Sequence, residues 1–309
     1  MRTISKKWKR EEKAKNQYRL RLALIAMPIY NSWPVVEKSL AALLKYATDS
    51  NIFLIYNHPP ENILAKVRSM VKRKGNVILL IPPTNYGVTR SLNWAFSHGT
   101  NDHQILFKID DDTIVCKGFV EKMTKAIKTF DNVAFVCASS NAEQANESFT
   151  IQERGGISLK LYSQGCLSFS CMAIGREKYE LLGEMSADYR IFKDGKWEVI
   201  KGDRLYGGEE AYYAKRAREE NLLMGKLGDV YVYHQDNEEK DIDYVVWKHS
   251  YGYFGTVNCS LDELKQDKEL LVCEVKRLYD FGKDTNNNWY IERARKRLET
   301  LGVSSLLRK

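Results

Sequence analysis

Short apolar segments alternate with amphipathic segments through the first third of the chain. The apolar segments predict strands at residues 22–27, 51–56, 76–81 and 104–109. The amphipathic segments predict helices at residues 34–46, 61–74 and 89–97. Strands that alternate with helices in this way form a parallel sheet with helices on both faces. The sequence therefore predicts an α/β fold with a mostly parallel central sheet.

A polar residue follows each of these predicted strands. In an open parallel sheet, ligands bind beyond the carboxyl ends of the strands, so side chains there are candidates for binding. The residues at these four positions are Asn31, Asn57, Asn85 and Asp110.

Three consecutive carboxylates, Asp110, Asp111 and Asp112, end the fourth predicted strand. Alternate residues of an extended strand point the same way, so we expect Asp110 and Asp112 to converge. Carboxylates that lie close together repel each other, and a divalent cation such as Mn²⁺ or Mg²⁺ removes this conflict. The alternative is an acidic turn, or a helix that begins at Thr113 with Asp112 as its N-cap.

The composition is that of an ordinary globular protein. The chain has 309 residues, of which 44% are hydrophobic and 28% are charged. No apolar run approaches the ~20 residues of a membrane-spanning helix. The N-terminal segment lacks the apolar stretch of a secretory signal, so we expect a cytoplasmic location. Six cysteines without a Cys-x-x-Cys pair predict reduced thiols.

Positive charge is concentrated at the two ends of the chain, whose net charge is +8. Residues 1–21 contain nine Lys or Arg against two Glu, and residues 293–309 contain six against one. The body between them is mildly acidic. Basic ends favour contact with a polyanion, either nucleic acid or an anionic membrane surface. Solvated helix faces are the alternative interpretation.

Several motifs resemble, in order and spacing, the large family of inverting nucleotide-sugar glycosyltransferases with the GT-A fold. The resemblance spans roughly residues 20–240. Its motifs are Pro28-Ile29-Tyr30-Asn31, Asn85-Tyr86-Gly87 with Arg90 and Asn93, Asp110-Asp111-Asp112, Gly207-Gly208-Glu209-Glu210 with Arg216, and the strand from Asp229 to His234. The resemblance implies a nucleotide-diphosphate sugar donor, a divalent metal and transfer of a sugar to an acceptor hydroxyl.

The resemblance also implies roles for individual residues. The metal ligands would be Asp112, Asp110 and His234. The catalytic base would be Glu210, for which Glu209 is a possible substitute. The nucleotide contacts would be Pro28, Tyr30, Asn31, Asn57, Asn85, Arg90, Asn93, Asp110 and Asp111. Relatives often carry an aspartate that reads uracil before the residue that matches Asn57, and this chain has Tyr56 there. Uridine specificity is therefore not indicated.

We predict three parts: a basic extension at residues 1–20, a GT-A catalytic domain at 21–240 and a helical extension at 241–309. Within the second part, we expect residues 188–203 to form a mobile acceptor loop.

The acceptor stays open between a hydroxymethylated base in DNA and a cell-envelope glycan or lipid at the cytoplasmic membrane face. A sugar nucleotidyltransferase and a non-catalytic nucleic-acid-binding protein remain alternative functions.

Overall fold

The computed structural model describes most of the chain as two compact units. The described residues are 23–59, 62–99, 103–141, 148–186, 189–193, 196–200, 209–235, 242–250, 257, 259, 261–284 and 287–307. The first unit is drawn from residues 23–86, 90–185 and 213–235, and the second from the remaining described residues. The predicted basic extension and the glycines of the Gly-Gly-Glu-Glu motif lie outside the described residues. The predicted domain boundaries at residues 20 and 240 remain predictions.

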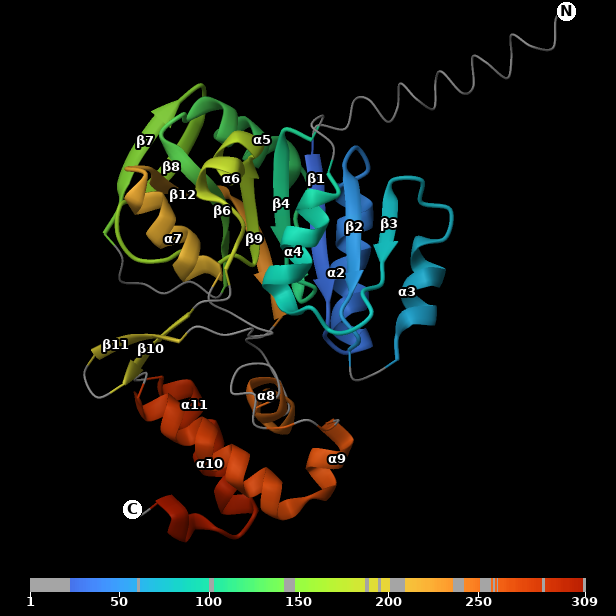
Figure 1. Cartoon of the computed structure of the whole chain (residues 1–309), viewed down its shortest axis with the longest axis vertical. Coiled ribbons are helices and arrows are strands. Elements are labelled where there is room, and N and C mark those ends of the chain that lie inside the picture. The colour runs from blue at the N-terminus through green and yellow to red at the C-terminus, as the bar shows by residue number, and fades with distance from the viewer. Residues whose placement is uncertain are drawn as a thin grey trace, which may run out of the picture. The chain divides into compact units, whose positions relative to one another are not determined.

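A ten-stranded sheet forms the centre of the first unit (Figure 1). Its order is β3-β2-β1-β4-β9-β6-β12-β8-β7, and β5 pairs with β12. The first four strands in this order pair in parallel, as the sequence predicted, and β12 also runs parallel to β6. The strands are β1 Ala23–Ile29, β2 Asn51–Tyr56, β3 Val77–Leu80, β4 Ile105–Ile109, β5 Thr113–Ile114, β6 Val133–Ser140, β7 Thr150–Arg154, β8 Ile157–Tyr162, β9 Cys171–Gly175 and β12 Leu223–His234.

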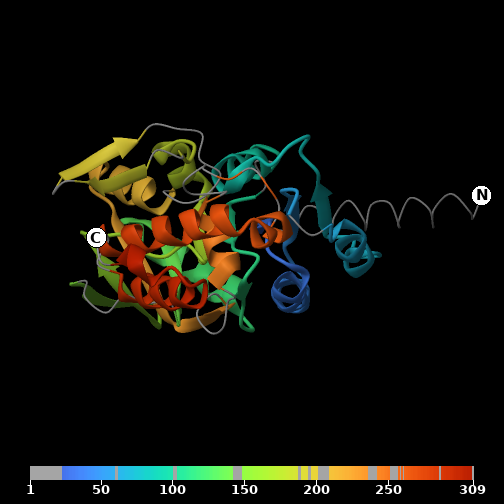
Figure 2. The same cartoon turned by 90° about the horizontal axis from the view of Figure 1, so that it is seen from below.

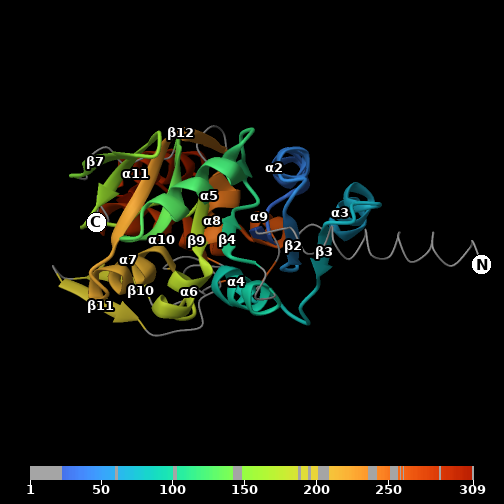
Figure 3. The same cartoon turned by 90° about the horizontal axis from the view of Figure 1, so that it is seen from above.

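Helices cover both faces of this sheet. The helices α2 and α5 lie on one face, and α4, α6 and α7 lie on the other (Figure 2 and Figure 3). The described helices that lie wholly or mostly in the first unit are α2 Trp33–Tyr46, α3 Leu64–Val71, α4 Gly87–Ser97, α5 Phe119–Thr129, α6 Arg176–Leu182 and α7 Glu209–Glu219. The prediction of an α/β fold with a mainly parallel central sheet is confirmed.

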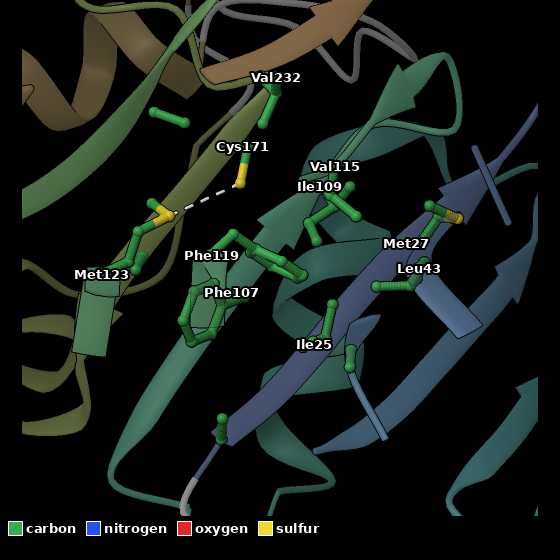
Figure 4. Close-up of a cluster of buried hydrophobic side chains, with 14 of the residues drawn as sticks. Ile25, Met27, Leu43, Phe107, Ile109, Val115, Phe119, Met123, Cys171 and Val232 are labelled. Atoms are coloured by element: carbon green, nitrogen blue, oxygen red, sulfur yellow. Dashed lines mark hydrogen bonds between the residues drawn. The ribbon is translucent and has the colours of Figure 1, made fainter. Parts of the chain in front are cut away.

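The core between the sheet, α2 and α5 makes the central strands rigid. Figure 4 shows Ile25, Phe107 and Phe119 within this cluster of buried side chains. The rings of Phe107 and Phe119 meet edge to face with centroids 6.0 Å apart, and both side chains are fully buried. Burial of one such side chain stabilises a fold by roughly 1.5–3 kcal/mol. The end of β4 is therefore held in a fixed position.

The second unit consists mainly of helices. Its helices are α8 Ile242–Lys248, α9 Leu261–Gln266, α10 Lys268–Asp284 and α11 Asn288–Thr300, followed by the 3₁₀ helix Ser304–Leu307. Buried Asp243 accepts two hydrogen bonds from Arg297, at 2.7 and 2.6 Å, which joins α8 to α11. Gly282 permits the close approach of α10 and α11, since a Cβ there would lie 3.0 Å from Cβ of Tyr290. Among the described helices, none is both long and apolar enough to cross a membrane.

Most of the segment at residues 188–203, which we expected to be a loop, forms two paired strands, whereas its mobility and its role toward an acceptor remain predictions. The strands β10 Tyr189–Lys193 and β11 Lys196–Ile200 pair antiparallel. The sequence between them is Asp194-Gly195, a dipeptide that favours two-residue hairpin turns. The flanking aromatic and β-branched residues favour strands, and they outweigh the charged residues of the segment.

Candidate metal and nucleotide site

Asp110, Asp112 and His234 form a cluster of possible metal ligands. Each offers one ligand atom, and these atoms all lie within 4.8 Å of one another. The predicted convergence of Asp110 and Asp112 is therefore confirmed. The alternative of a helix capped by Asp112 is wrong, because Thr113 begins the short strand β5 and α5 begins only at Phe119. Two carboxylates and one imidazole are a donor set that fits Mn²⁺ or Mg²⁺.

Strand pairing brings His234 to the aspartates from 122 positions further along the chain. Antiparallel pairing of β5 with β12 places Thr113 opposite His234. The N–H of Gln235 donates to the carbonyl of Asp112 at 2.9 Å. As a result, Nε2 of His234 lies 3.3 Å from Oδ1 of Asp112.

Asn141 holds the main chain of His234 from the other side. Its Oδ1 accepts the N–H of His234 at 2.7 Å, and its Nδ2 donates to the carbonyl at 2.9 Å. The sequence analysis missed Asn141. The available signal was its position directly after the apolar strand β6, which matches the position of Asn57 directly after β2.

Asp111 connects the end of β4 to the end of β1. Its carboxylate accepts the main-chain N–H groups of Tyr30 at 2.6 Å and Asn31 at 2.7 Å, and the side-chain amide of Asn31 at 2.5 Å. Burial, and then the charge of Asp112, raises the pKa of Asp111 to about 6, although these N–H donors act against the rise. The motifs around Asn31 and Asp111 therefore form one continuous structure.

A lysine that the sequence analysis did not single out lies beneath Asp110. Lys108 is 1% exposed, and its Nζ is 2.8 Å from Oδ1 of Asp110. Burial raises the pKa of Asp110 above its ordinary value, and the charge of Lys108 opposes this rise. In the sequence, a single polar residue within an apolar strand gave no sign that its side chain would be buried.

Several predicted nucleotide contacts meet at the carboxyl ends of β1 and β2. Pro28 lies in β1 opposite Ile55 of β2. Asn57 is buried, and its Oδ1 accepts the hydroxyl of Ser91 at 2.9 Å and the N–H of Tyr86 at 3.4 Å. These bonds place the start of α4 beside the end of β2.

The remaining predicted contacts occupy varied environments. Asn85 is half-buried and Arg90 is exposed. Asn93 bonds to the main chain of Met185, through Oδ1 at 2.9 Å and Nδ2 at 2.8 Å. Tyr56 is buried in the core cluster. Its ring therefore packs in the core.

Glu209 and Glu210 are the first residues of α7. Glu209 is 3% exposed, whereas Glu210 is half-buried. Further along, the hydroxyl of Tyr213 donates to the carbonyl of Gly183 at 2.7 Å, and Nε of Arg216 donates to that of Leu182 at 3.1 Å. These bonds anchor the helix through its second and third turns. Their partners are main-chain groups, so the anchoring does not depend on neighbouring side chains.

Comparison with known families identifies the family of this chain. Residues 24–182, just over half of the chain, match the model of glycosyl transferase family 2. The chain belongs to this family. No curated protein sequence matches this family 2 chain.

Solved structures share the GT-A fold with this family 2 chain at low sequence identity. GalNAc-T7, crystallised with UDP, GalNAc and Mn²⁺, is 11% identical with a TM-score of 0.52, and the match covers 89% of this chain and 55% of that one. The mannosyltransferase PcManGT from Pyrobaculum calidifontis, in complex with GDP-Man and Mn²⁺, is 12% identical with a TM-score of 0.53, covering 93% and 78%. TarS from S. aureus is 13% identical with a TM-score of 0.50, covering 85% and 49%. The match thus spans about half the length of GalNAc-T7 and of TarS.

Proposed function

We propose that this family 2 protein is a metal-dependent inverting glycosyltransferase, which moves a sugar from a nucleotide-diphosphate donor to an acceptor hydroxyl. The observation that carries this proposal is the cluster of Asp110, Asp112 and His234 at the carboxyl edge of a family 2 sheet. Family membership argues against the sugar nucleotidyltransferase and against the non-catalytic nucleic-acid-binding protein.

Asp112, Asp110 and His234 would hold Mn²⁺ or Mg²⁺. When bound, this cation supplies stabilisation of the negative charge that develops on the departing diphosphate. Mn²⁺ is present in the structures of GalNAc-T7 and PcManGT, which supports the choice of metal. Asp111 would also support the donor site, because it fixes the main chain of Tyr30 and Asn31 beside the metal ligands.

The nucleotide would lie along the ends of β1 and β2 and the start of α4. The residues proposed to contact it are Pro28, Tyr30, Asn31, Asn57, Asn85, Arg90, Asn93, Asp110 and Asp111. The two similar structures with nucleotides contain UDP and GDP-Man, so they do not agree on one base. We therefore propose a nucleotide-diphosphate sugar without specifying the base or the sugar.

Glu210 is the proposed catalytic base. An inverting transfer requires a carboxylate that takes the proton of the acceptor hydroxyl while its oxygen attacks the anomeric carbon opposite the leaving group. Glu210 is more accessible than Glu209, which is 3% exposed. A helix N-terminus favours the ionised carboxylate by about 0.3–1 kcal/mol, which suits a base. Glu209 is the second candidate.

For the acceptor, we propose a hydroxymethylated base in DNA, and a cell-envelope glycan or lipid at the cytoplasmic membrane face is the alternative. The support is the basic sequence at both ends of the chain. Binding of duplex DNA that weakens steeply with salt would favour the first acceptor, because each phosphate contact releases counterions. Binding of anionic lipid vesicles without DNA binding would favour the second.

The proposal is tested by melting the protein with the diphosphate sugars of uridine, guanosine, cytidine and thymidine, each with and without Mn²⁺. A ligand at 100 times its dissociation constant adds about 2.7 kcal/mol to the free energy of unfolding. We expect one donor to raise the melting temperature only with the metal. Asp112→Asn should abolish this shift, and the matched change at exposed Asp229, Asp229→Asn, should leave it intact. Failure of every donor with every metal would contradict the proposal.

A further inference from the structure

Lys108 occupies an unusual position for a lysine. It lies in β4 between two buried neighbours, Ala26 of β1 and Met172 of β9, and it is 1% exposed. Lysine is almost never fully buried unless its charge is paired, because removal of the ammonium group from water is costly. A buried lysine at the centre of a sheet therefore requires a partner that offsets the cost of removing its charge from water.

The described partner is the first carboxylate of the proposed metal site. Lys108 and Asp110 are two residues apart at the end of one strand, so their side chains share a face of the sheet. The Nζ atom lies 2.8 Å from Oδ1 of Asp110, whose side chain is 23% exposed. The ring centroid of Phe169 lies 6.0 Å from Nζ, at the limit of a cation–π contact. The ion pair is thus formed largely out of water.

The three consecutive aspartates are held by groups of different kinds. Main-chain and side-chain N–H groups hold Asp111, and the imidazole of His234 lies beside Asp112. The ammonium group of Lys108 holds Asp110. A charge-assisted hydrogen bond restricts the orientation of a carboxylate more than a neutral one does. Lys108 therefore favours a single rotamer of Asp110.

We propose that Lys108 is a positioning residue, which fixes the carboxylate of Asp110 beside Asp112 and His234 before a cation binds. It contacts neither metal nor substrate and acts through Asp110. Its bond to Oδ1 leaves Oδ2 as the oxygen better able to serve a cation. The inference rests on the proposed function, since it takes Asp110 as a metal ligand. Loss of a group that orients a metal ligand typically weakens metal binding by about 10–100-fold.

The test is a titration of the full chain with Mn²⁺ in the absence of donor, followed by the electron paramagnetic resonance signal of free Mn²⁺. Lys108→Met retains the apolar length of the side chain without a donor. Lys108→Gln retains an N–H donor without the charge. We expect the dissociation constant to rise at least tenfold in Lys108→Met and by less in Lys108→Gln.

Lys160→Met is the matched control, because Lys160 also extends from a strand, β8, over an aromatic ring, at 4.8 Å from the centroid of Phe149. We expect it to bind Mn²⁺ as the original chain does. A folded Lys108→Met with unchanged or tighter Mn²⁺ binding would overturn the inference. A lower melting temperature with unchanged Mn²⁺ affinity would also overturn it, because it would show that Lys108 stabilises the fold without orienting Asp110. If Lys108→Met does not fold, the same criterion applies to Lys108→Gln.

The two proposals fail in different ways. If the original chain binds Mn²⁺ and Asp112→Asn does not, the proposed metal site stands, and the Lys108 variants alone decide this inference. If the original chain binds no Mn²⁺ in the absence of donor, this inference falls, whereas the proposed function falls only if every donor also fails with every metal.

Discussion

The main chain of His234 is bonded on both sides by the side-chain amide of Asn141, which accepts its N–H at 2.7 Å and donates to its carbonyl at 2.9 Å. Asn141 follows β6 and His234 ends β12, so these two bonds extend the pairing of the two strands by one residue. The direction in which the imidazole projects is thereby set by a residue that lies outside the cluster itself.

Asn141→Ala should loosen His234 and weaken Mn²⁺ binding by about 10–100-fold, as is typical when a metal ligand loses its supporting partner. Calorimetric titration with Mn²⁺ measures this effect. Asn132→Ala is the control, because Asn132 is exposed just before the start of the same strand. Equal Mn²⁺ affinity in the two variants would show that Asn141 does not orient His234.

Asp111→Ala should destabilise the fold and weaken donor binding, because it leaves the N–H groups of Tyr30 and Asn31 without their carboxylate acceptor. Buried donors that lose an acceptor cost about 1–3 kcal/mol. Urea unfolding measures the loss, and the donor melting screen measures binding. Asp131→Ala, at an exposed turn before β6, is the control and should change neither quantity. Wild-type stability of Asp111→Ala would refute this account of the carboxylate.

Tyr179 should make stability depend on pH in the alkaline range. Burial, followed by the charge of Glu184, raises the pKa of Tyr179 to about 12 from its ordinary value of 10.0. The folded state therefore favours the protonated phenol, so its contribution is complete below pH 10 and is lost as the pH rises towards 12.

Urea unfolding from pH 9 to pH 12 measures this effect as the difference between the original chain and Tyr179→Phe. The variant should lose about 1 kcal/mol at neutral pH, because the hydroxyl bonds to Oδ1 of Asn93. Its stability should then fall less steeply above pH 10. Tyr231→Phe, at a residue that is 52% exposed, should retain the original slope. Parallel curves for Tyr179→Phe and the original chain would contradict the assignment.

Gly282→Ala should destabilise the second unit. The new Cβ would lie 3.0 Å from Cβ of Tyr290 and 3.1 Å from the main-chain N of Ile291, so α11 would have to move away from α10. Overpacking typically costs about 1–3 kcal/mol, and the better helix propensity of alanine offsets up to about 1 kcal/mol of this. Thermal unfolding measures the net loss. Gly228→Ala, where nothing lies within 4 Å of the new Cβ, should show none.

Local sequence patterns predicted the parallel half of the sheet because each of its strands is a short apolar run with a turn or helix on either side. They also predicted the convergence of Asp110 and Asp112 from the two-residue period of a strand. In the structure, β4 ends at Ile109 and a turn brings the two residues together, closed by the N–H of Thr113 donating to the carbonyl of Asp110 at 3.1 Å. The strands at residues 189–193 and 196–200 were not predicted, because the charged residues of this segment favoured a loop.

Local sequence patterns did not predict contacts between segments that lie far apart in the chain. The insertion of β9 between β4 and β6 is a pairing of remote segments, and no local period encodes it. The bonds of Asn141 to His234 depend on that register, as does the burial of Lys108 between β1 and β9. Motif order alone linked His234 to the aspartates, because the resemblance to a family carries long-range information that periodicity lacks.

The separation of Asp112 and His234 along the chain has a consequence for synthesis on the ribosome. Translation delivers the three aspartates early, whereas β12 emerges only after a further hundred or so residues have been added, a delay of several seconds or more at about 5–20 residues per second. During that interval the nascent sheet has its acidic tip but lacks the histidine that completes the cluster. Strands that pair during that interval do so without a cation bound at the full site, and the ammonium group of Lys108, made just before the aspartates, is a positive charge that accompanies them from the start.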